Sequence, residues 1–161
     1  MKIGILSDTH DHLARIAQAV VLFNEEEVGL VLHAGDFASP ATARELRRLH
    51  APLVGVFGNN DGDRLFLTKA FSGVGSLHSG PHEFDVAGQR GVLMHEPRCL
   101  EALVESGSFR LVVYGHTHEV DLREGNPLVV NPGECGGWLT GRSTVVVVDT
   151  EGFSARLVDL A

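Results

Sequence analysis

Residues 2–57 alternate between short apolar runs and amphipathic helical patterns, and this rhythm limits the folds open to the chain more than any other feature. Apolar runs at residues 2–7, 30–32 and 52–57 are typical of buried strands. The helical patterns between them begin at polar residues, Asp11 as a cap for the first and Ser39-Pro40 for the second. Strand–helix–strand repeats with short loops predict parallel strands joined by right-handed crossovers.

The rest of the chain is richer in strand patterns. Helices are expected at residues 64–70 and 98–105. Strands are expected at residues 76–78, 82–86, 91–94, 111–114, 120–123, 128–130, 144–149 and 154–158. These elements predict an α/β fold, a four-layer α/β/β/α sandwich of two mixed β-sheets flanked by helices. No linker or repeat interrupts the chain, so residues 1–161 are expected to form a single domain.

Composition and charge exclude some classes of function. No apolar run approaches the roughly 20 residues that span a bilayer, and the apolar start is too short for a signal peptide. We therefore expect a cytoplasmic protein with no membrane partner, in which Cys99 and Cys135 are reduced thiols. The net charge of −8 argues against a nucleic-acid partner. A phosphate-bearing substrate stays open, because bound divalent cations reverse the local field.

Side chains of metal-binding type stand at or just after the predicted strand ends. They are Asp8, His10, Asp36, Asn59, His95, His116 and His118. Because parallel strands present their carboxyl ends at one edge of a sheet, loops far apart in sequence can converge there. The spacings Asp-x-His and His-x-His place alternate side chains on one side of an extended segment, where both can face the same metal. Glycines before Asp36, Asn59 and His116 permit sharp turns and close backbone approach.

The donor set is imidazole, carboxylate and amide oxygen without thiolate. It suits divalent transition-metal ions better than Ca²⁺ or Cu⁺. The expected cofactor is Mn²⁺, with Ni²⁺, Zn²⁺, Fe²⁺ or Co²⁺ as alternatives. Each motif alone is weak, since a glycine before Asp usually marks a turn. His95 alone is equally well explained as a hydrogen-bonded histidine at a strand end. The complete series at successive strand ends has no explanation in packing, and it therefore predicts a metal site.

The motifs together resemble those of the calcineurin-like metallophosphoesterases. They are Asp8-Thr9-His10, Gly35-Asp36, Gly58-Asn59-Asn60-Asp61, His95 and Gly115-His116-Thr117-His118. The chain length, the opening Lys2-Ile3-Gly4-Ile5-Leu6-Ser7 and the later Asn131-Pro132-Gly133 are similar to the small bacterial and archaeal phosphodiesterase branch. The resemblance covers nearly the whole chain and implies a double β-sandwich flanked by helices.

The resemblance also implies a mechanism. One metal would be held by Asp8, His10, Asp36 and His118, and the other by Asp36, Asn59, His95 and His116, with Asp36 bridging. A bridged pair about 3.5–4 Å apart can hold a hydroxide for in-line attack on phosphorus and can neutralise charge on the phosphoryl oxygens. The implied enzyme is a dinuclear metal-dependent phosphodiesterase acting on small phosphodiesters, and the relatives allow a homo-oligomer.

The sequence departs from the family pattern at the residue after Asn59. Many members of the wider family have histidine there, whereas this chain has Asn60. An amide can donate a hydrogen bond to a phosphoryl oxygen, but it cannot act as a general acid near neutral pH. We therefore count Asn60 with Asp36 and His95 among the catalytic residues and expect phosphodiesters with stable leaving groups to be preferred.

Two further departures lie beside the motifs. Glu96-Pro97 follows His95 where glycine is usual, and the simpler interpretation is that Glu96 caps the next helix. Glu134 replaces the usual serine after Asn131-Pro132-Gly133 and opens a glycine-rich segment, residues 133–142. That segment either lines the substrate cleft or is a flexible connection with a partly packed Trp138. Asp61 is expected to orient a ligand or loop through hydrogen bonds, and His33 to be buried at its strand end.

Two other functions remain open from the sequence. One is a catalytically weak or inactive family member that acts as a protein-binding scaffold, as the retromer small subunit does. The intact ligand set argues against it, and no large apolar surface stripe is evident. The other is a nuclease, which the acidic composition disfavours.

Overall fold

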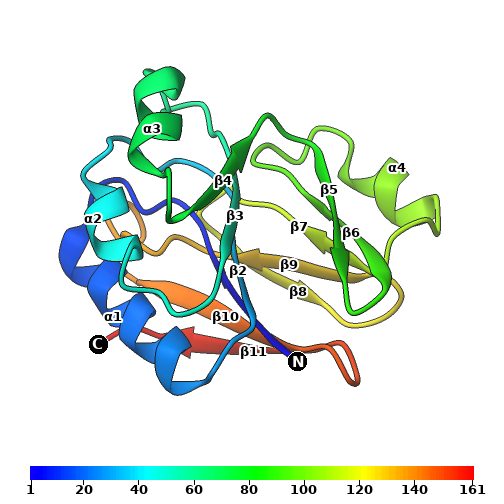
Figure 1. Cartoon of the computed structure of the whole chain (residues 1–161). Helices are drawn as coiled ribbons and strands as arrows, with labels where there is room; N and C mark the ends of the chain where they lie inside the picture. Colours follow the sequence, from blue (N-terminus) through cyan, green and yellow to red (C-terminus); the bar gives the residue numbers. More distant parts are fainter.

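The computed structural model describes residues 1–161 and contains eleven strands and four helices (Figure 1). In chain order they are β1 (Lys2–Leu6), α1 (Leu13–Glu25), β2 (Leu30–His33), α2 (Thr42–Leu46), β3 (Leu53–Val56), α3 (Arg64–Ala70), β4 (Gly75–His78), β5 (His82–Val86), β6 (Gln89–Leu93), α4 (Leu100–Glu105), β7 (Leu111–Val113), β8 (Val120–Arg123), β9 (Leu128–Pro132), β10 (Thr144–Asp149) and β11 (Ser154–Asp159).

The first sheet has the strand order β11-β10-β1-β2-β3-β4. Strands β1, β2 and β3 are parallel, as the alternation of strand and helix patterns predicts, and β4 also pairs parallel with β3. Strand β10 returns antiparallel against β1, pairing Ile5 with Val146, and β11 pairs antiparallel with β10. The sheet is therefore mixed, with β1 in its interior between an early and a late part of the chain.

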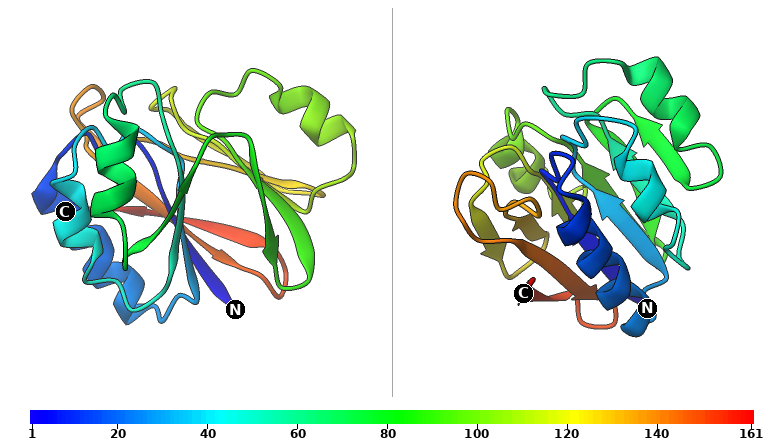
Figure 2. Two further views of the ribbon diagram at one scale, coloured as in Figure 1. Left: turned by 45° about the horizontal axis from the view of Figure 1, so that its top comes forward. Right: turned by 90° about the vertical axis from the view of Figure 1, so that its left-hand side faces the viewer.

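The second sheet has the order β5-β6-β7-β9-β8 and is also mixed. Strands β6, β7 and β9 are parallel, while β5 and β8 close the two edges as antiparallel hairpin partners. Figure 2 shows the two sheets facing each other across the middle of the molecule. The parallel strands of both sheets end towards the same side, which brings their loops together.

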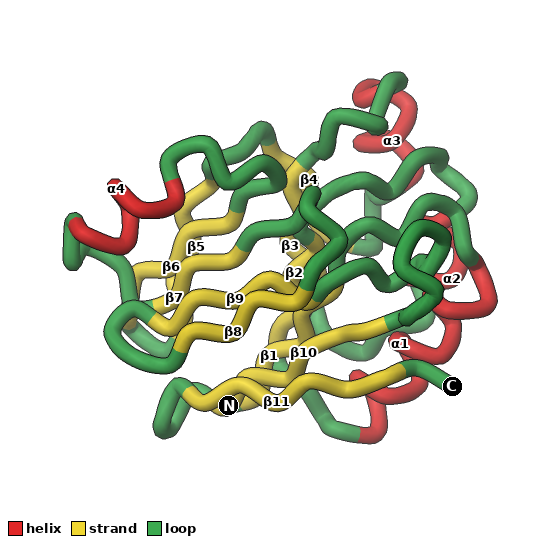
Figure 3. Tube along the Cα trace, turned by 180° about the vertical axis from the view of Figure 1, so that it is seen from behind, coloured by secondary structure: helices red, strands yellow, loops and turns green.

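An apolar layer fills the space between the sheets. Side chains from β1, β2 and β10 meet those of β6, β7 and β9 there, among them Ile5, Val146, Leu111 and Val130, all fully buried. A second cluster packs α1 and α2 on the outer face of the first sheet, and a third packs α4 on the outer face of the second. Figure 3 shows the helices on the outer sides of the strands. The four-layer prediction is confirmed.

The helices differ from their predictions at the caps. Asp11 does not cap α1; the Nδ1 atom of His12 accepts from the Arg15 amide at 3.4 Å, and Asp11 instead accepts from the amide and hydroxyl of Ser39. The buried stripe of α1 consists of Ile16, Ala19, Val20 and Phe23, while Leu13 is exposed. Helix α2 begins at Thr42 rather than at Pro40 because Ser39-Pro40 form a turn first.

Other boundaries move by a few residues at most. Helix α4 begins at Leu100, and Glu96 does not cap it, because the Glu96 carboxylate pairs with Arg98 Nε at 2.6 Å.

Both cysteines are free, Cys99 exposed and Cys135 buried. The longest helix has 13 residues, and none is long and apolar enough to cross a membrane.

Candidate metal centre

The predicted ligands meet where the two sheets end. The loops after β1, β2 and β3 bring Asp8, His10, Asp36 and Asn59 from the first sheet, and those after β6 and β7 bring His95, His116 and His118 from the second. All seven lie in one contiguous group of side chains. The site therefore exists only when the two sheets are packed together.

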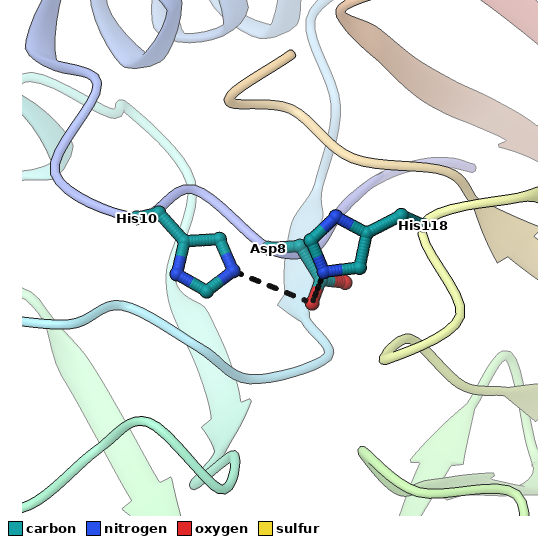
Figure 4. A group of neighbouring side chains, drawn as sticks. All are labelled: Asp8, His10 and His118. Atoms are coloured by element: carbon teal, nitrogen blue, oxygen red, sulfur yellow. Dashed lines mark ion pairs between the residues drawn. The ribbon is translucent and has the colours of Figure 1, made fainter. Parts of the chain in front are cut away.

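One half of the site gathers around the Asp8 carboxylate. Figure 4 shows the His10 and His118 rings converging on Asp8 Oδ1, at Nε2 distances of 3.9 and 3.4 Å. The two rings are stacked, with centroids 5.4 Å apart. Asp8 Oδ1 and His10 Nε2 are buried atoms without any hydrogen-bond partner. Such groups are costly to bury unpaired, so this arrangement is the one expected around a cation.

The other half gathers around Asp36 and Asn59. Asp36 Oδ2 lies 3.5 Å from His95 Nε2 and also 3.5 Å from His10 Nε2, so this carboxylate faces both halves. Asn59 Oδ1 lies 2.9 Å from His95 Nε2 and 2.9 Å from His116 Nδ1. Two donors that bind one transition-metal ion at about 2.1 Å each stand about 3–3.5 Å apart, so these spacings fit metal ligation. Carboxylate and histidine donor atoms converge in two overlapping groups, Asp8–His10–His118 and Asp8–Asp36–His95.

The backbone reaches this arrangement through the left-handed region. Asp8, His10, Asp36, His116 and His118 all have positive φ, between 40° and 72°. The explanation of Asp-x-His by an extended segment was therefore wrong, since the chain turns sharply at each ligand. His116 and His118 also face different partners, Asn59 and Asp8 respectively. Positive φ at several non-glycine residues is rare and costs free energy, and such strain concentrates at functional sites.

Two glycines provide room for the carboxylates rather than a special backbone conformation. A Cβ atom at Gly58 would overlap the Asp36 carboxylate, and one at Gly115 would overlap Ser7 Oγ and crowd Asp8. Neither glycine has positive φ, whereas Gly35 does, at 100°. Any side chain at Gly58 or Gly115 would displace a predicted ligand.

Hydrogen bonds set the charge of the central groups. Burial alone would raise the pKa of Asp36, but hydrogen bonds from His95 and Asn60 outweigh it and hold that pKa well below its usual range. Burial raises the pKa of Asp8, against the hydrogen bond from Ser7. The pKa of His95 is raised, because Asp36 outweighs the effect of burial. Asp36 is thus the firmest negative charge of the site.

Asp61 and His33 support the ligand loops from behind. Asp61 Oδ2 accepts from the backbone amides of Asp36 and Gly58, at 3.0 and 2.7 Å, as its predicted orienting role requires. His33 is fully buried, as predicted, and its ring stacks on Phe37. Burial lowers the pKa of His33 to about 3, so its ring is neutral and accepts from the Gly35 amide at 3.1 Å.

Asn60 is hydrogen-bonded to Asp36, the residue predicted to bridge the two metals. Its side-chain amide donates to Asp36 Oδ2 at 2.7 Å, and its backbone amide donates to Asp36 Oδ1 at 2.8 Å. In this arrangement Asn60 orients the Asp36 carboxylate. The side-chain amide has a second N–H, which the bond to Asp36 leaves for another acceptor such as a phosphoryl oxygen.

The sequence motifs missed one residue in contact with the site. Glu134 is fully buried, and its Oε2 lies 3.0 Å from His118 Nδ1. Its signal in the sequence was its replacement of the usual serine after Asn131-Pro132-Gly133. Asn131 itself donates to the Gly115 carbonyl and to Thr117, which ties β9 to the His116–His118 loop. The two residues together hold that loop in place.

Two features frame the opening of the site. A cavity of about 330 Å³ is lined by Asn59 and His95 at one end and by Arg64, Glu96 and Arg98 elsewhere. Trp138, beside His10, is 62% exposed; its ring centroid lies 4.5 Å from that of His12, and its Nε1 donates to the His10 carbonyl at 3.2 Å. Trp138 is therefore an anchored, exposed aromatic surface beside a predicted ligand.

Comparison with known proteins agrees with this geometry. Residues 1–152 match the model of the calcineurin-like phosphoesterase superfamily domain. The chain belongs to this family, and the predicted class, a metal-dependent phosphoesterase, is confirmed. Family membership implies divalent metal ions, and the Asp and His clusters described above are suited to bind them.

The chain resembles two curated archaeal proteins over most of its length. A phosphodiesterase of Methanocaldococcus jannaschii is 40% identical over 161 residues, covering 94% of each chain. A protein of Methanothermobacter thermautotrophicus named "Probable metallophosphoesterase" is 34% identical, covering 98% of this chain and 92% of the relative.

Among solved structures, that of an archaeal phosphodiesterase superposes with a TM-score of 0.93 at 38% identity, covering 99% of this chain and all of the other. Vps29 of Chaetomium thermophilum superposes with a TM-score of 0.72 at 18% identity, covering 98% of this chain and 85% of that one, a likeness of fold alone.

Asp8 Oδ1 and His10 Nε2, the buried atoms without a hydrogen-bond partner, predict that metal binding stabilises the folded protein. Mn²⁺ at about 100 times its Kd should add about 2.7 kcal/mol to the free energy of unfolding, which raises Tm by about 5–10 °C in a domain of this size. Asp8→Asn should lose most of this shift, because it removes the charge that faces both His10 and His118. Thermal unfolding of metal-stripped protein with and without Mn²⁺ measures it.

The exposed Asp85→Asn change is the charge-matched control and should keep the full shift. An Asp8→Asn protein that responds to Mn²⁺ as the wild type does would contradict this assignment.

Proposed function

We propose that the protein is a dinuclear metal-dependent phosphodiesterase that hydrolyses small phosphodiesters. The observation that carries the proposal is the position of Asp36, whose Oδ2 lies 3.5 Å from both His10 and His95 and so joins the two halves of the site. A carboxylate in that place suits a bridge between two ions. The relatives named as phosphodiesterases, 40% and 38% identical, support the diester class.

In this proposal Asp8, His10, Asp36 and His118 hold one ion, and Asp36, Asn59, His95 and His116 hold the other. Two such ions supply an activated water and neutralise charge on the phosphoryl oxygens. The protein's own residues fix the geometry. Asn60 and His95 keep Asp36 ionised, and Asp61 holds the loops that carry Asp36 and Asn59. The nitrogen and oxygen donor set suits Mn²⁺, the first candidate, and also Ni²⁺, Zn²⁺, Fe²⁺ and Co²⁺.

The cavity beside His95 and Asn59 supports a small substrate. Its volume of about 330 Å³ is at the lower end of the roughly 300–1,000 Å³ typical of small-molecule pockets. It has room for one ester group of a diester whose phosphorus lies at the predicted metals. The net charge of −8 disfavours a polyanionic substrate that would extend over the surface. A cytoplasmic location belongs to this proposal as well.

The activity is tested with bis(p-nitrophenyl) phosphate and added Mn²⁺. Wild-type protein should release nitrophenolate, and Asp36→Asn should reduce kcat by at least about 10³-fold, because it weakens the proposed bridge and the charge stabilisation it supports. Asp85→Asn, at an exposed position of strand β5, is the control. Absence of turnover in metal-loaded wild type would favour the scaffold function, and cleavage of DNA or RNA oligomers would favour a nuclease.

Asn60 predicts a preference among leaving groups. Without a general acid, the enzyme should cleave aryl diesters far faster than alkyl diesters, since nitrophenolate leaves without protonation. Asn60→His should raise kcat for an alkyl diester by up to about 10²-fold and leave the aryl rate almost unchanged. Equal alkyl rates in the wild type and in Asn60→His would refute this role for residue 60.

A further inference from the structure

Glu134 lies behind the predicted metal ligand His118. The two nitrogens of the His118 ring are divided between two carboxylates: Nδ1 lies 3.0 Å from Glu134 Oε2, and Nε2 lies 3.4 Å from Asp8 Oδ1. Glu134 is fully buried, whereas His118 is only partly so. The ring is therefore clamped from the interior and presents its second nitrogen to the metal centre.

The Glu134 carboxylate is itself held by several donors. It accepts from the backbone amides of Trp138, Leu139 and Thr140 and from the Thr140 hydroxyl. These donors fix the Glu134 carboxylate with its Oε2 facing His118 Nδ1, where the carboxylate oxygen is placed to accept a hydrogen bond from that nitrogen.

We propose that Glu134 is a positioning residue that fixes the orientation and tautomer of His118, leaving the Nε2 lone pair free for the metal. A carboxylate on the far nitrogen of a ligating histidine raises ligand basicity, and its loss typically lowers metal affinity about 10–100-fold. The serine usual in the family carries no charge and has a shorter side chain. Glu134 also links the metal centre to the 133–142 segment through the amides of Trp138, Leu139 and Thr140. These hydrogen bonds hold the segment in a fixed position beside the site, so it is not a flexible connection.

Metal affinity tests the proposal without reference to activity. Calorimetric titration of metal-stripped protein with Mn²⁺ should show a Kd raised about 10–100-fold in Glu134→Ala and less in Glu134→Gln. Glu119→Gln is the control, because Glu119 is exposed and adjacent to His118 in sequence. In a His118→Ala background, Glu134→Ala should cause almost no further loss, since the residue that it acts through is gone.

The ring itself gives a second readout. In ¹⁵N-labelled protein the His118 signals should show a protonated Nδ1 in the wild type and lose that pattern in Glu134→Ala. Equal losses of affinity in the wild-type and His118→Ala backgrounds would show a merely structural role and overturn the proposal. An unchanged affinity in Glu134→Ala would overturn it as well. Neither result bears on diester hydrolysis, so failure here is separate from failure of the proposed function.

A second inference concerns the cavity and rests on the proposed function. Arg64, the first residue of α3, has its guanidinium 5.2 Å from the Phe57 ring and donates to the carbonyls of Asp61 and Gly58. It has no carboxylate partner within ion-pair distance, whereas Arg98 on the same cavity is paired with Glu96. Arg64 is thus the unneutralised cation of the cavity, and it begins the helix that follows the loop of Asn59.

We infer that the cavity binds the non-leaving ester group of the diester and favours a group that carries a second anion, which Arg64 would contact. Two matched substrates test this: p-nitrophenyl pentyl phosphate and p-nitrophenyl 4-carboxybutyl phosphate. Wild type should prefer the carboxylate. Arg64→Gln should lower kcat/KM for the carboxylate by about tenfold or more, the size of a lost charge-assisted hydrogen bond, and for the pentyl compound less than about twofold.

The control is Arg44→Gln on α2, an exposed arginine that also lacks a carboxylate partner. Arg44→Gln should leave kcat/KM unchanged for both the carboxylate and the pentyl substrate. Equal effects of Arg64→Gln on the two substrates would overturn the inference while the proposed function stands. No turnover of either substrate by wild type would overturn both.

Discussion

Two carboxylates, Asp8 and Asp36, are buried side by side at the centre of this molecule, and the rest of the site is arranged to make that burial tolerable. A buried charge is costly unless it is paired or hydrogen-bonded. Ser7 and the His116 amide bond one oxygen of Asp8, and Asn60 and His95 support Asp36. Asp8 Oδ1 still has no partner. The uncompensated negative charge on this buried oxygen is the physical reason that the site suits cations.

This cluster depends on the packing of two sheets. Asp8 and Asp36 follow strands of the first sheet, while His95 and His118 follow strands of the second. The apolar layer between the sheets, with Ile5 opposite strands β7 and β9, fixes the distance across which these side chains meet. The left-handed turns at Asp8 and His118 add local strain that the surrounding core and hydrogen bonds must offset. In this packing the donor atoms of the site stand near the spacing that metal ligation requires.

The second sheet also supplies support that the family motifs do not contain. Asn131 holds the His116–His118 loop, and Glu134 holds the His118 ring and three amides of the following segment. That segment carries Trp138 to the edge of the site beside His10. A departure from the family pattern thus has a structural consequence at a predicted metal ligand. The cavity beside Asn59 and His95 has a different character, because it contains Arg64, which has no carboxylate partner.

The sequence by itself determined the layer architecture, because strand and helix periodicities are local, and it placed all seven predicted ligands at strand ends. It also indicated Asp61 as an orienting residue. It did not determine how the ligands face one another. The extended geometry assumed for Asp8-x-His10 was wrong, Asp11 and Glu96 do not cap helices, and Asn60 contacts Asp36. The role of Glu134 was also hidden, since its contact with His118 spans 16 residues. These features depend on backbone turns and long-range contacts, which only the packing of the two sheets decides.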